Sequence, residues 1–305
     1  MSQNKTILLT FDVEDWFQVE NLRPWIPFSS WDSYELRVER NTYLLLDLLD
    51  TINLKTNNDN PKNINESKPK ATFFVLGWIV KHLPNLVREM DKRGHEVASH
   101  GFNHNLCYSQ SYAELKKDLI NSKKMIEDII GKPVFGYRAP SFSISDSVLK
   151  TIQSCGYQYD SSFNTFDRHG RYGHIEISNY SVKGSIYKVN NDFFEVPLSN
   201  LSFHGKVIPW AGGGYFRLLP FFIFKEGVKY ILRSEDTYIF YAHPWEFDPH
   251  QPIVKQATRI NKFKHYMNLS KTAARLGSFL NYFSNCRFLT CHVHINEKWG
   301  KNEQY

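Results

Sequence analysis

The residues best suited to chemistry are His100 and His104, four positions apart in the stretch SHGFNH. Two imidazoles at this spacing can point the same way from one turn of helix or from a tight loop, so that both bind one divalent metal. Residues 95–98 predict a short buried strand, which would place the pair where that strand ends. Because two histidines at this spacing also occur by chance on protein surfaces, the prediction of a metal site needs partners elsewhere in the chain.

Carboxylates that could complete such a site lie near the N-terminus. Residues 6–13 are apolar and β-branched and predict a buried strand, and Asp12, Glu14 and Asp15 cluster at its end. In a strand, Asp12 and Glu14 point to the same side, so both could reach one metal site, one as general base and the other as ligand. A solvated loop or a helix N-cap would explain the cluster without any chemistry.

Further polar side chains follow later predicted strands. Arg138, Asp160 and His243 each come directly after a short apolar stretch with strand character. Alone, each has a plain explanation: a surface salt bridge for Arg138, a turn cap for Asp160 and a core histidine for His243. Strands alternate with helical patterns along the chain, and this alternation, with polar residues at strand ends, predicts a parallel α/β barrel.

The periodicity of apolar residues indicates the elements that would hold these side chains. Helices are expected over residues 36–50, over 111–131 with a capping box at its start, and over 256–283. The Asn-rich residues 55–70 cannot bury a core face and predict a mobile surface insertion. We therefore expect a barrel domain over residues 1–250 and a helical extension over 251–305 packed on it.

Composition and charge exclude several classes of protein. The 305 residues are 42% hydrophobic with a net charge of +6, and no Lys/Arg block is long enough to indicate nucleic-acid binding. No apolar run is long enough for a membrane span, and residues 6–11 are too short for a signal peptide. The four cysteines lack CxxC spacing and indicate reduced thiols. We expect a cytoplasmic protein. A solvated surface explains the excess charge most simply, although a mildly basic face would also suit an anionic glycan or a peripheral position on the inner membrane.

Taken together, five stretches resemble a known family. TFDVED, SHGFNH, GYRAPSF, YDSS and YAHPWE, in this order over residues 6–247, resemble the motifs of the polysaccharide deacetylases, the NodB-homology or carbohydrate esterase family 4 enzymes. Residues 37–42 and 212–220 and the helical tail resemble the subgroup with a C-terminal DUF3473 extension, associated with exopolysaccharide and capsule gene clusters. The resemblance implies a distorted (β/α)7 barrel, NodB-like, with a C-terminal helical extension. It further implies a divalent metal, most often zinc, and removal of N-acetyl groups from an amino sugar in a polysaccharide or glycan precursor.

The resemblance also implies roles for single residues. Asp12 would be the general base, with Arg138 holding it in place, and His100 and His104 would be metal ligands. His243 would be the general acid, tuned by Asp160. The first motif of the family usually has two adjacent aspartates, of which the second binds the metal.

This chain departs from that pattern at two positions. Val13 stands where the second aspartate is expected, so the carboxylate ligand must be Glu14 or Asp15, and strand parity favours Glu14. The tryptophan of the fourth motif is absent, and Phe163 or Trp245 could supply the apolar wall instead.

Substrate contacts and two alternative functions complete the expectations. Pro140, Trp210, Tyr215 and Trp245 are expected to contact the sugar. The glycine-rich stretch 210–216 predicts a tight turn, because no Lys-Ser/Thr follows it as in a phosphate cradle. An amidohydrolase acting on a small non-sugar amide, or a non-catalytic glycan-binding module, would also fit, and metal content with acetate release would separate the three.

Overall fold

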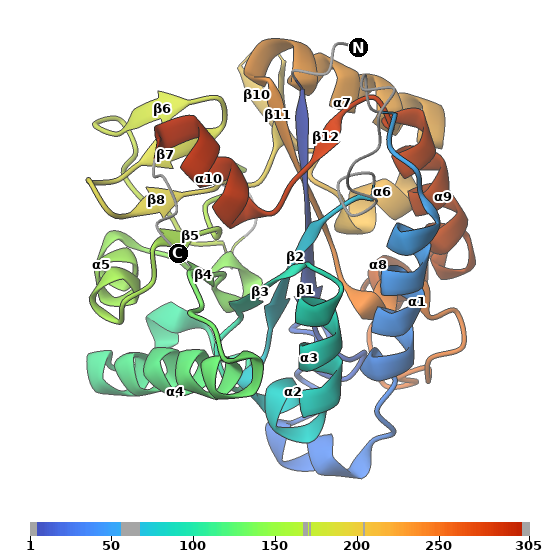
Figure 1. The fold of residues 1–305 in the computed structure, drawn as a ribbon. Coiled ribbons are helices and arrows are strands. Elements are labelled where there is room, and N and C mark those ends of the chain that lie inside the picture. Colours follow the sequence, from blue (N-terminus) through green and yellow to red (C-terminus); the bar gives the residue numbers. More distant parts are fainter. Residues whose placement is uncertain (1–4, 56–67, 167–169, 171, 204, 301–305) are drawn as a thin grey trace.

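A ten-stranded sheet forms the centre of the molecule in the computed structural model, which describes residues 5–55, 68–166, 170, 172–203 and 205–300. The strand order is β11-β1-β2-β3-β4-β5-β8-β7-β6, and β12 also pairs with β1 (Figure 1). The strands of the sheet are β1 (Thr6–Val13), β2 (Ala71–Val75), β3 (Glu96–Ser99), β4 (Gly136–Tyr137), β5 (Tyr159–Asp160), β6 (Ser181–Lys183), β7 (Ile186–Lys188), β8 (Phe194–Glu195), β11 (Thr237–Ala242) and β12 (Arg287–Phe288). A separate hairpin consists of β9 (Asn200–Phe203) and β10 (Lys206–Pro209).

Helices pack around this sheet. Figure 1 shows α1 to α4 in front of the strands and α9 beside α1. The helices are α1 (Val38–Thr51), α2 (Gly77–His82), α3 (Pro84–Lys92), α4 (Tyr112–Ile130), α5 (Asp146–Ser154), α6 (Gly213–Leu218), α7 (Phe221–Glu235), α8 (Arg259–Tyr266), α9 (Leu269–Tyr282) and α10 (Cys291–Trp299). None of the helices in the described ranges is long and apolar enough to span a membrane.

The sheet is a curled half-barrel in a mixed α/β fold. Strands β11 through β8 run parallel, whereas β6 and β7 are antiparallel to their neighbours. Within the described ranges, the end strands β11 and β6 are not paired with each other, so the expected barrel is open. The short β4, β5 and β8 offer few backbone groups for pairing, and the β6–β7 hairpin ends the parallel order at one edge.

Strand β1 is buried on both faces, and its alternate residues pack into two different cores. Ile7, Leu9 and Phe11 belong to the large core under the helices, whereas Leu8 packs in a second core on the inner side. Side chains alternate along a strand, so Asp12 projects to the same inner side as Leu8. The period of two along this strand therefore directs a carboxylate toward the concave side of the sheet.

Several predicted elements are confirmed with shifted ends. The helix expected over 36–50 is α1, and the capping box of α4 is present, with Gly131 ending the helix at φ 69°. The pattern over 256–283 is two helices, α8 and α9, because Asn268 between them has a left-handed φ of 55°. The glycine-rich stretch does not form only a tight turn, since α6 begins within it at Gly213.

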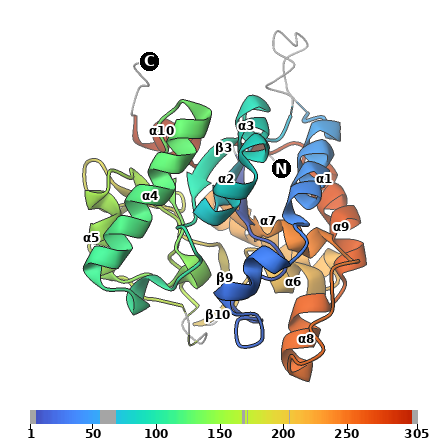
Figure 2. The same ribbon diagram turned by 90° about the horizontal axis from the view of Figure 1, so that it is seen from below.

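The C-terminal part is more than a helical extension. Strand β12 pairs with β1 in parallel, and α10 contributes Cys291 and Ile295 to the inner core. A two-residue strand has no periodic pattern, which is why the sequence did not predict it. In the view from below (Figure 2), α8 lies at the edge of the molecule beside α6. The insertion predicted over 55–70 lies, for residues 56–67, outside the described residues.

Candidate active site

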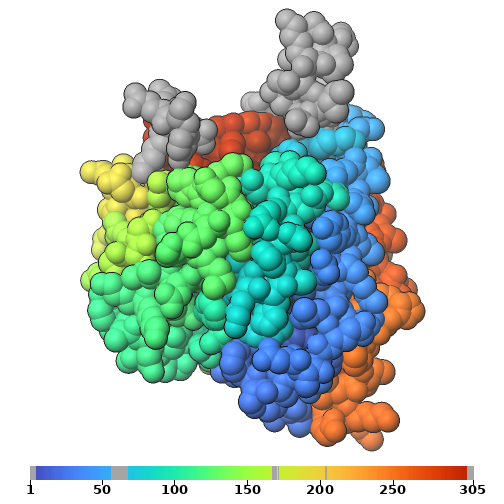
Figure 3. Space-filling view, turned by 60° about the horizontal axis from the view of Figure 1, so that its bottom comes forward, coloured from blue at the N-terminus to red at the C-terminus, as the bar shows by residue number. Residues whose placement is uncertain are grey.

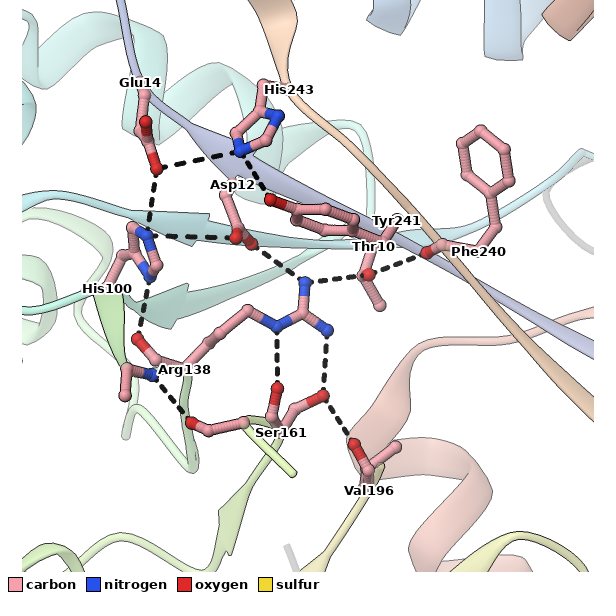
Figure 4. Close-up of polar contacts among 12 residues, drawn as sticks. Thr10, Asp12, Glu14, His100, Arg138, Ser161, Val196, Phe240, Tyr241 and His243 are labelled. Atoms are coloured by element: carbon pink, nitrogen blue, oxygen red, sulfur yellow. Dashed lines mark hydrogen bonds and ion pairs between the residues drawn. The ribbon is translucent and has the colours of Figure 1, made fainter. Parts of the chain in front are cut away.

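Four strand ends bring the predicted site residues together. Asp12 and Glu14 lie at the end of β1, His100 follows β3, Arg138 follows β4 and His243 follows β11. The carboxyl ends of parallel strands meet at one edge of a sheet, and Figure 4 shows these five side chains turned toward a common centre. Asp12, Glu14, His100 and Arg138 are at most 3% exposed, so their charges interact in a poorly hydrated site.

The closest cluster of potential metal ligands is Glu14, His100 and His104. Oε1 of Glu14 lies 3.1 Å from Nε2 of His100 and 3.0 Å from Nε2 of His104. Nδ1 of His100 donates a hydrogen bond to the carbonyl of Arg138 at 2.7 Å. With Nδ1 as a donor, Nε2 of His100 can face the carboxylate of Glu14 only if a proton or a metal cation lies between them, because a lone pair and a carboxylate oxygen repel each other.

The donor set fits a divalent metal. Two imidazole nitrogens and one carboxylate oxygen form the ligand set of many catalytic zinc sites, and a backbone acceptor on the second ring nitrogen orients such a ligand. His104 has a left-handed φ of 55°, which is costly for a residue with a Cβ, so the surrounding structure holds this residue in place. Burial alone would raise the pKa of Glu14, but the His104 and His243 imidazoles and hydrogen bonds from His100 and His104 hold it well below its usual value.

Asp12, Glu14 and His243 form a second, overlapping group of possible ligands. In this group His243 Nε2 is 3.8 Å from Glu14 Oε1, farther than either of the other two histidines. The same Nε2 is 2.7 Å from the hydroxyl of Tyr241, so the His243 ring already has a polar partner there. The tighter group with His100 and His104 is the better metal site.

Arg138 anchors Asp12, as predicted from the resemblance. Nη1 of Arg138 donates to Asp12 Oδ1 at 2.8 Å and to Thr10 Oγ1 at 2.9 Å. Its other guanidinium nitrogens donate to the carbonyl and the hydroxyl of Ser161, both at 2.8 Å (Figure 4). With Arg138 fully buried, these contacts leave the second carboxylate oxygen of Asp12 facing His100 at 3.8 Å.

Asp15, the alternative carboxylate ligand, has a different task. Its Oδ2 accepts hydrogen bonds from the backbone N–H groups of Arg37 and Val38, at 2.7 and 2.9 Å, and its Oδ1 accepts from Trp16. These bonds satisfy donors at the start of α1. Burial raises the pKa of Asp15 to about 6, although the backbone hydrogen bonds oppose the shift. The geometry thus assigns Glu14 to the histidine cluster and Asp15 to the helix terminus.

The predicted pairing of Asp160 with His243 is wrong. Nδ1 of His243 lies 2.8 Å from Oε1 of Glu246, and the backbone N–H of His243 donates to the same oxygen at 3.1 Å. Glu246 stands three residues after His243 in a short 3-10 turn over Pro244–Phe247, which brings the carboxylate back to the ring. Burial lowers the pKa of His243, but Glu14, Glu246 and Asp12 outweigh it, so the net shift is upward.

Asp160 instead supports the backbone beside Arg138. Its two oxygens accept from the N–H and hydroxyl of Ser162, whose Oγ in turn accepts from the N–H of Ala139 at 2.7 Å. Burial raises the pKa of Asp160 to about 6. Burial and the charge of Asp160 raise the pKa of the adjacent Glu195 well above its usual value.

Arg217 connects Glu246 to the segment that contains α8. Nε of Arg217 donates to Glu246 Oε2 at 2.6 Å, and its remaining nitrogens donate to the carbonyls of Lys264, His265 and Met267. Arg217 and Glu246 are 2% and 1% exposed. The charge of Arg217 helps to keep the pKa of Glu246 below its usual value against the effect of burial.

A pocket of 610 Å³ opens beside these residues, and only some of the predicted substrate contacts line it. Tyr215 and Trp245 line it together with Asp12, Glu14 and His243. Trp245 stacks on His243 at 5.1 Å between ring centroids and supplies the apolar wall that Phe163 does not.

Two of the predicted substrate contacts lie elsewhere. Trp210 is 7% exposed, stacks on Phe224 and donates to its carbonyl at 2.9 Å, so it belongs to the core and not to the pocket. Pro140 is also buried and does not line the pocket, whereas its neighbours Ser141 and Phe142 do. Aromatic character alone did not distinguish a groove side chain from a core side chain.

Sequence reasoning missed Tyr241, Glu246 and Arg217. For Glu246 a signal existed, because a glutamate three residues after the first residue of a helical turn is the spacing of a capping box. Tyr241 is at the end of the predicted strand, where only the curl of the sheet shows which side it faces. Arg217 had no local signal, since its side-chain partners come from two distant segments, Glu246 and residues 264–267.

Two family models match the chain. Residues 61–159 match the polysaccharide deacetylase family, and residues 161–294 match a domain of unknown function, DUF3473. The first match agrees with the resemblance of the five motif stretches, and the second agrees with the resemblance of residues 37–42, 212–220 and the helical tail to the DUF3473 subgroup. The carboxylates of β1 lie before the first match, and His243 and Glu246 lie within the second. Both matched regions therefore contribute to the site.

Named relatives are deacetylases of N-acetylated sugars. The chain is 36% identical over 95 residues to a peptidoglycan-N-acetylglucosamine deacetylase of Bacillus cereus, covering 31% of this chain and 44% of that protein. It is 28% identical over 94 residues to a chitooligosaccharide deacetylase of Azorhizobium caulinodans, covering 30% and 45%. The chain spans less than half the length of these relatives.

Solved structures share the fold. A polysaccharide deacetylase candidate from Mycobacterium smegmatis superposes with a TM-score of 0.62 at 16% identity, covering 99% of this chain and 92% of that one. The allantoinase PuuE superposes with a TM-score of 0.60 at 12% identity, over the same shares of the two chains. These likenesses establish a NodB-like fold.

Proposed function

We propose that this protein is a metal-dependent deacetylase that hydrolyses the N-acetyl group of an amino sugar in a polysaccharide or glycan precursor. One observation carries the proposal: Glu14, His100 and His104 converge beside an anchored Asp12 and a paired His243, and all of these residues except His100 line one pocket. The deacetylase relatives support the choice of an N-acetylated sugar as substrate. Exopolysaccharide metabolism, suggested by the DUF3473 resemblance, is part of the proposal.

A metal would be held by Glu14, His100 and His104, with zinc as the expected ion because nitrogen donors dominate the set. When bound, it would polarise the amide carbonyl and increase the acidity of water. Asp12, fixed by Arg138, takes the proton from the attacking water. Nε2 of His243 donates a proton to the sugar nitrogen as the C–N bond breaks, so that acetate and a free amine leave.

Each acid–base role has support in the geometry. The Arg138 contacts hold Asp12 in one orientation, and general-base catalysis is typically worth about 10²–10⁴-fold in rate. Glu246 accepts from Nδ1–H of His243, which leaves Nε2 as the nitrogen that carries the acidic proton into the pocket. The stacked Trp245 keeps the ring in place and limits its contact with water.

The free cysteines support a reducing location. None of Cys107, Cys155, Cys286 and Cys291 is in a disulfide, and three of the four are buried. We propose a cytoplasmic site of action on this ground, because unpaired thiols are typical of reducing compartments. Localisation of a tagged full-length chain by cell fractionation checks it, and recovery outside the cytoplasm would contradict it.

Acetate release tests the function directly. The full chain is assayed with N-acetylated mono- and oligosaccharides after chelation and after addition of Zn²⁺, Co²⁺ or Mn²⁺. We expect release only with metal, its loss in Asp12→Asn with metal content retained, and loss of both in His104→Ala. His82→Ala, a histidine on α2 away from the site, is the matched control. Release from a small non-sugar amide but from no sugar would favour the amidohydrolase, and no release from any amide would favour the binding module.

A further inference from the structure

A surface of unusual composition lies at the mouth of the pocket. Leu218 at the end of α6, together with Arg259, Ile260, Phe263 and Lys264 of α8, lines the same pocket as Asp12 and Glu14; we call these five residues the α8 rim. The three apolar residues of the rim are nonetheless exposed to solvent: Leu218 is 48% exposed, Ile260 66% and Phe263 60%. Large apolar side chains exposed together commonly mark a binding surface.

The position of α8 makes the rim accessible. Figure 2 shows α8 at the edge of the molecule on the face seen from below, and in Figure 3 the orange residues that include it protrude at the lower edge. Arg217 holds the backbone of this segment through the carbonyls of Lys264, His265 and Met267. The rim is therefore a supported surface and not a loose end.

The charge around the rim has one sign. Residues 249–296 contain seven Lys and Arg residues and no Asp or Glu, in a chain with 31 acidic residues. Four of the seven, Lys255, Arg259, Lys262 and Lys264, lie on α8 or just before it, and Lys262 Nζ donates to the Lys255 carbonyl at 3.1 Å. In the described part of the chain, no carboxylate forms a salt bridge with any of these four. Their charge is available to an external anion.

The side chains of the rim favour one kind of partner. Sugar rings need flat aromatic faces and polar groups, and the pocket supplies these deeper in, at Trp245, Asn164 and Asn200. The rim instead presents two branched aliphatic side chains and one phenyl ring beside two cations, and it contains no amide, hydroxyl or carboxylate side chain. That combination complements a surface that offers acyl chains and anionic headgroups together.

We propose that the α8 rim docks on an anionic lipid bilayer and that the substrate is an amino sugar carried at that surface. Ile260 and Phe263, three residues apart on one helix, enter the headgroup region while Arg259 and Lys264 contact anionic lipids. The rim lines the pocket, so docking places the membrane beside the entrance to the site. The docking is independent of the proposed function, whereas the identity of the substrate depends on it.

Vesicle binding tests the docking. The full chain is sedimented with vesicles of phosphatidylcholine alone and of phosphatidylcholine mixed with phosphatidylglycerol. We expect binding to the mixed vesicles that weakens as salt is added, because interfacial charges are screened. The pair Ile260→Ser and Phe263→Ser, and the pair Arg259→Gln and Lys264→Gln, should each lower this binding at least about tenfold, the combined loss of two anchoring contacts. Tyr112→Ser with Lys117→Gln, exposed positions on α4, is the matched control.

Three results would overturn the docking. These are failure to bind the mixed vesicles, equal binding by wild type and rim variants, and self-association of the wild type without lipid that the rim variants lose. The last would make the rim an interface between copies of this chain.

Asp12→Asn separates this proposal from the proposed function, since it should abolish acetate release and keep vesicle binding. N-acetylglucosamine linked to a polyprenyl phosphate in mixed vesicles should lose its acetyl group faster than the free sugar does. The rim variants should deacetylate the two substrates at similar rates. Equal rates on the two substrates by the wild type would overturn the membrane-borne substrate.

Discussion

Among single residues, Glu246 is the hydrogen-bond partner that orients the proposed general acid, His243. The carboxylate of Glu246 lies against Nδ1 of His243, and Arg217 holds it from the other side. The family resemblance of the sequence implied this tuning role for Asp160. Here Asp160 hydrogen-bonds to Ser162 and supports the strand end that carries Arg138.

The pH dependence of the rate should reveal this exchange of partners. An acid must be protonated, and the raised pKa of His243 keeps its ring protonated to higher pH, so the basic limb lies above the range of a free imidazole. Glu246→Gln preserves shape but removes one of the three charges that raise this pKa, beside those of Glu14 and Asp12, so the basic limb moves to lower pH. Asp160→Asn leaves the basic limb in place. Profiles of kcat against pH on an N-acetylated sugar measure both, and a shift in Asp160→Asn alone would restore the original assignment.

A second prediction distinguishes the two adjacent carboxylates. Glu14→Gln should lose bound metal, because an amide oxygen is a weaker ligand than a carboxylate. Asp15→Asn should keep its metal and change stability by about 1 kcal/mol, the usual worth of a helix-capping residue. Metal analysis and thermal unfolding of the two variants provide the measurement. Metal loss in Asp15→Asn but not in Glu14→Gln would show that Asp15, and not Glu14, is the metal ligand.

The helices offer a matched test of packing against helix propensity. A Cβ on Gly227, within α7, would lie 2.2 Å from Nε1 of the buried Trp210, whereas a Cβ on Gly277, within α9, would meet Leu48 Cδ1 at an ordinary 3.6 Å. Replacing a helical glycine by alanine gains about 0.5–1 kcal/mol, but overpacking a core costs about 1–3 kcal/mol. Gly277→Ala should therefore raise the free energy of unfolding and Gly227→Ala should lower it. Denaturant unfolding of both variants decides, and stabilisation by Gly227→Ala would show that Trp210 can move.

Across the whole molecule, strand β12 of the C-terminal part belongs to the central sheet. Phe288 of β12 pairs with Ile7 of β1 and is 3% exposed. Phe288→Ala should therefore destabilise the entire fold, by about 3–5 kcal/mol, as expected for a large aromatic side chain removed from a core.

Val293→Ala, a 38% exposed position on α10, should change stability by only about 0.5 kcal/mol. Calorimetry of the full chain checks whether unfolding stays a single transition. A separate transition for the C-terminal part, or equal effects of the two variants, would mark it as an independent unit.

Features that depend on neighbours in the chain were predictable. The period of two along β1 directs Asp12 inward, and the spacing of Ser111 and Glu114 specifies the capping box of α4. The arrangement of His100 and His104 at a strand end is local in the same way. In each case the residues that interact are a few positions apart, so backbone geometry alone relates them.

Contacts between distant segments needed the tertiary structure. The partner of His243 depends on which carboxylate the 3-10 turn and the curled sheet bring to its Nδ1, and Glu246 prevails over Asp160 there. Trp210 packs in the core and not in the pocket because Gly227 leaves space for its ring. Strand β12 is too short to have a pattern and exists because β1 offers it backbone partners. These outcomes depend on packing and on burial of charge, which a linear pattern does not contain.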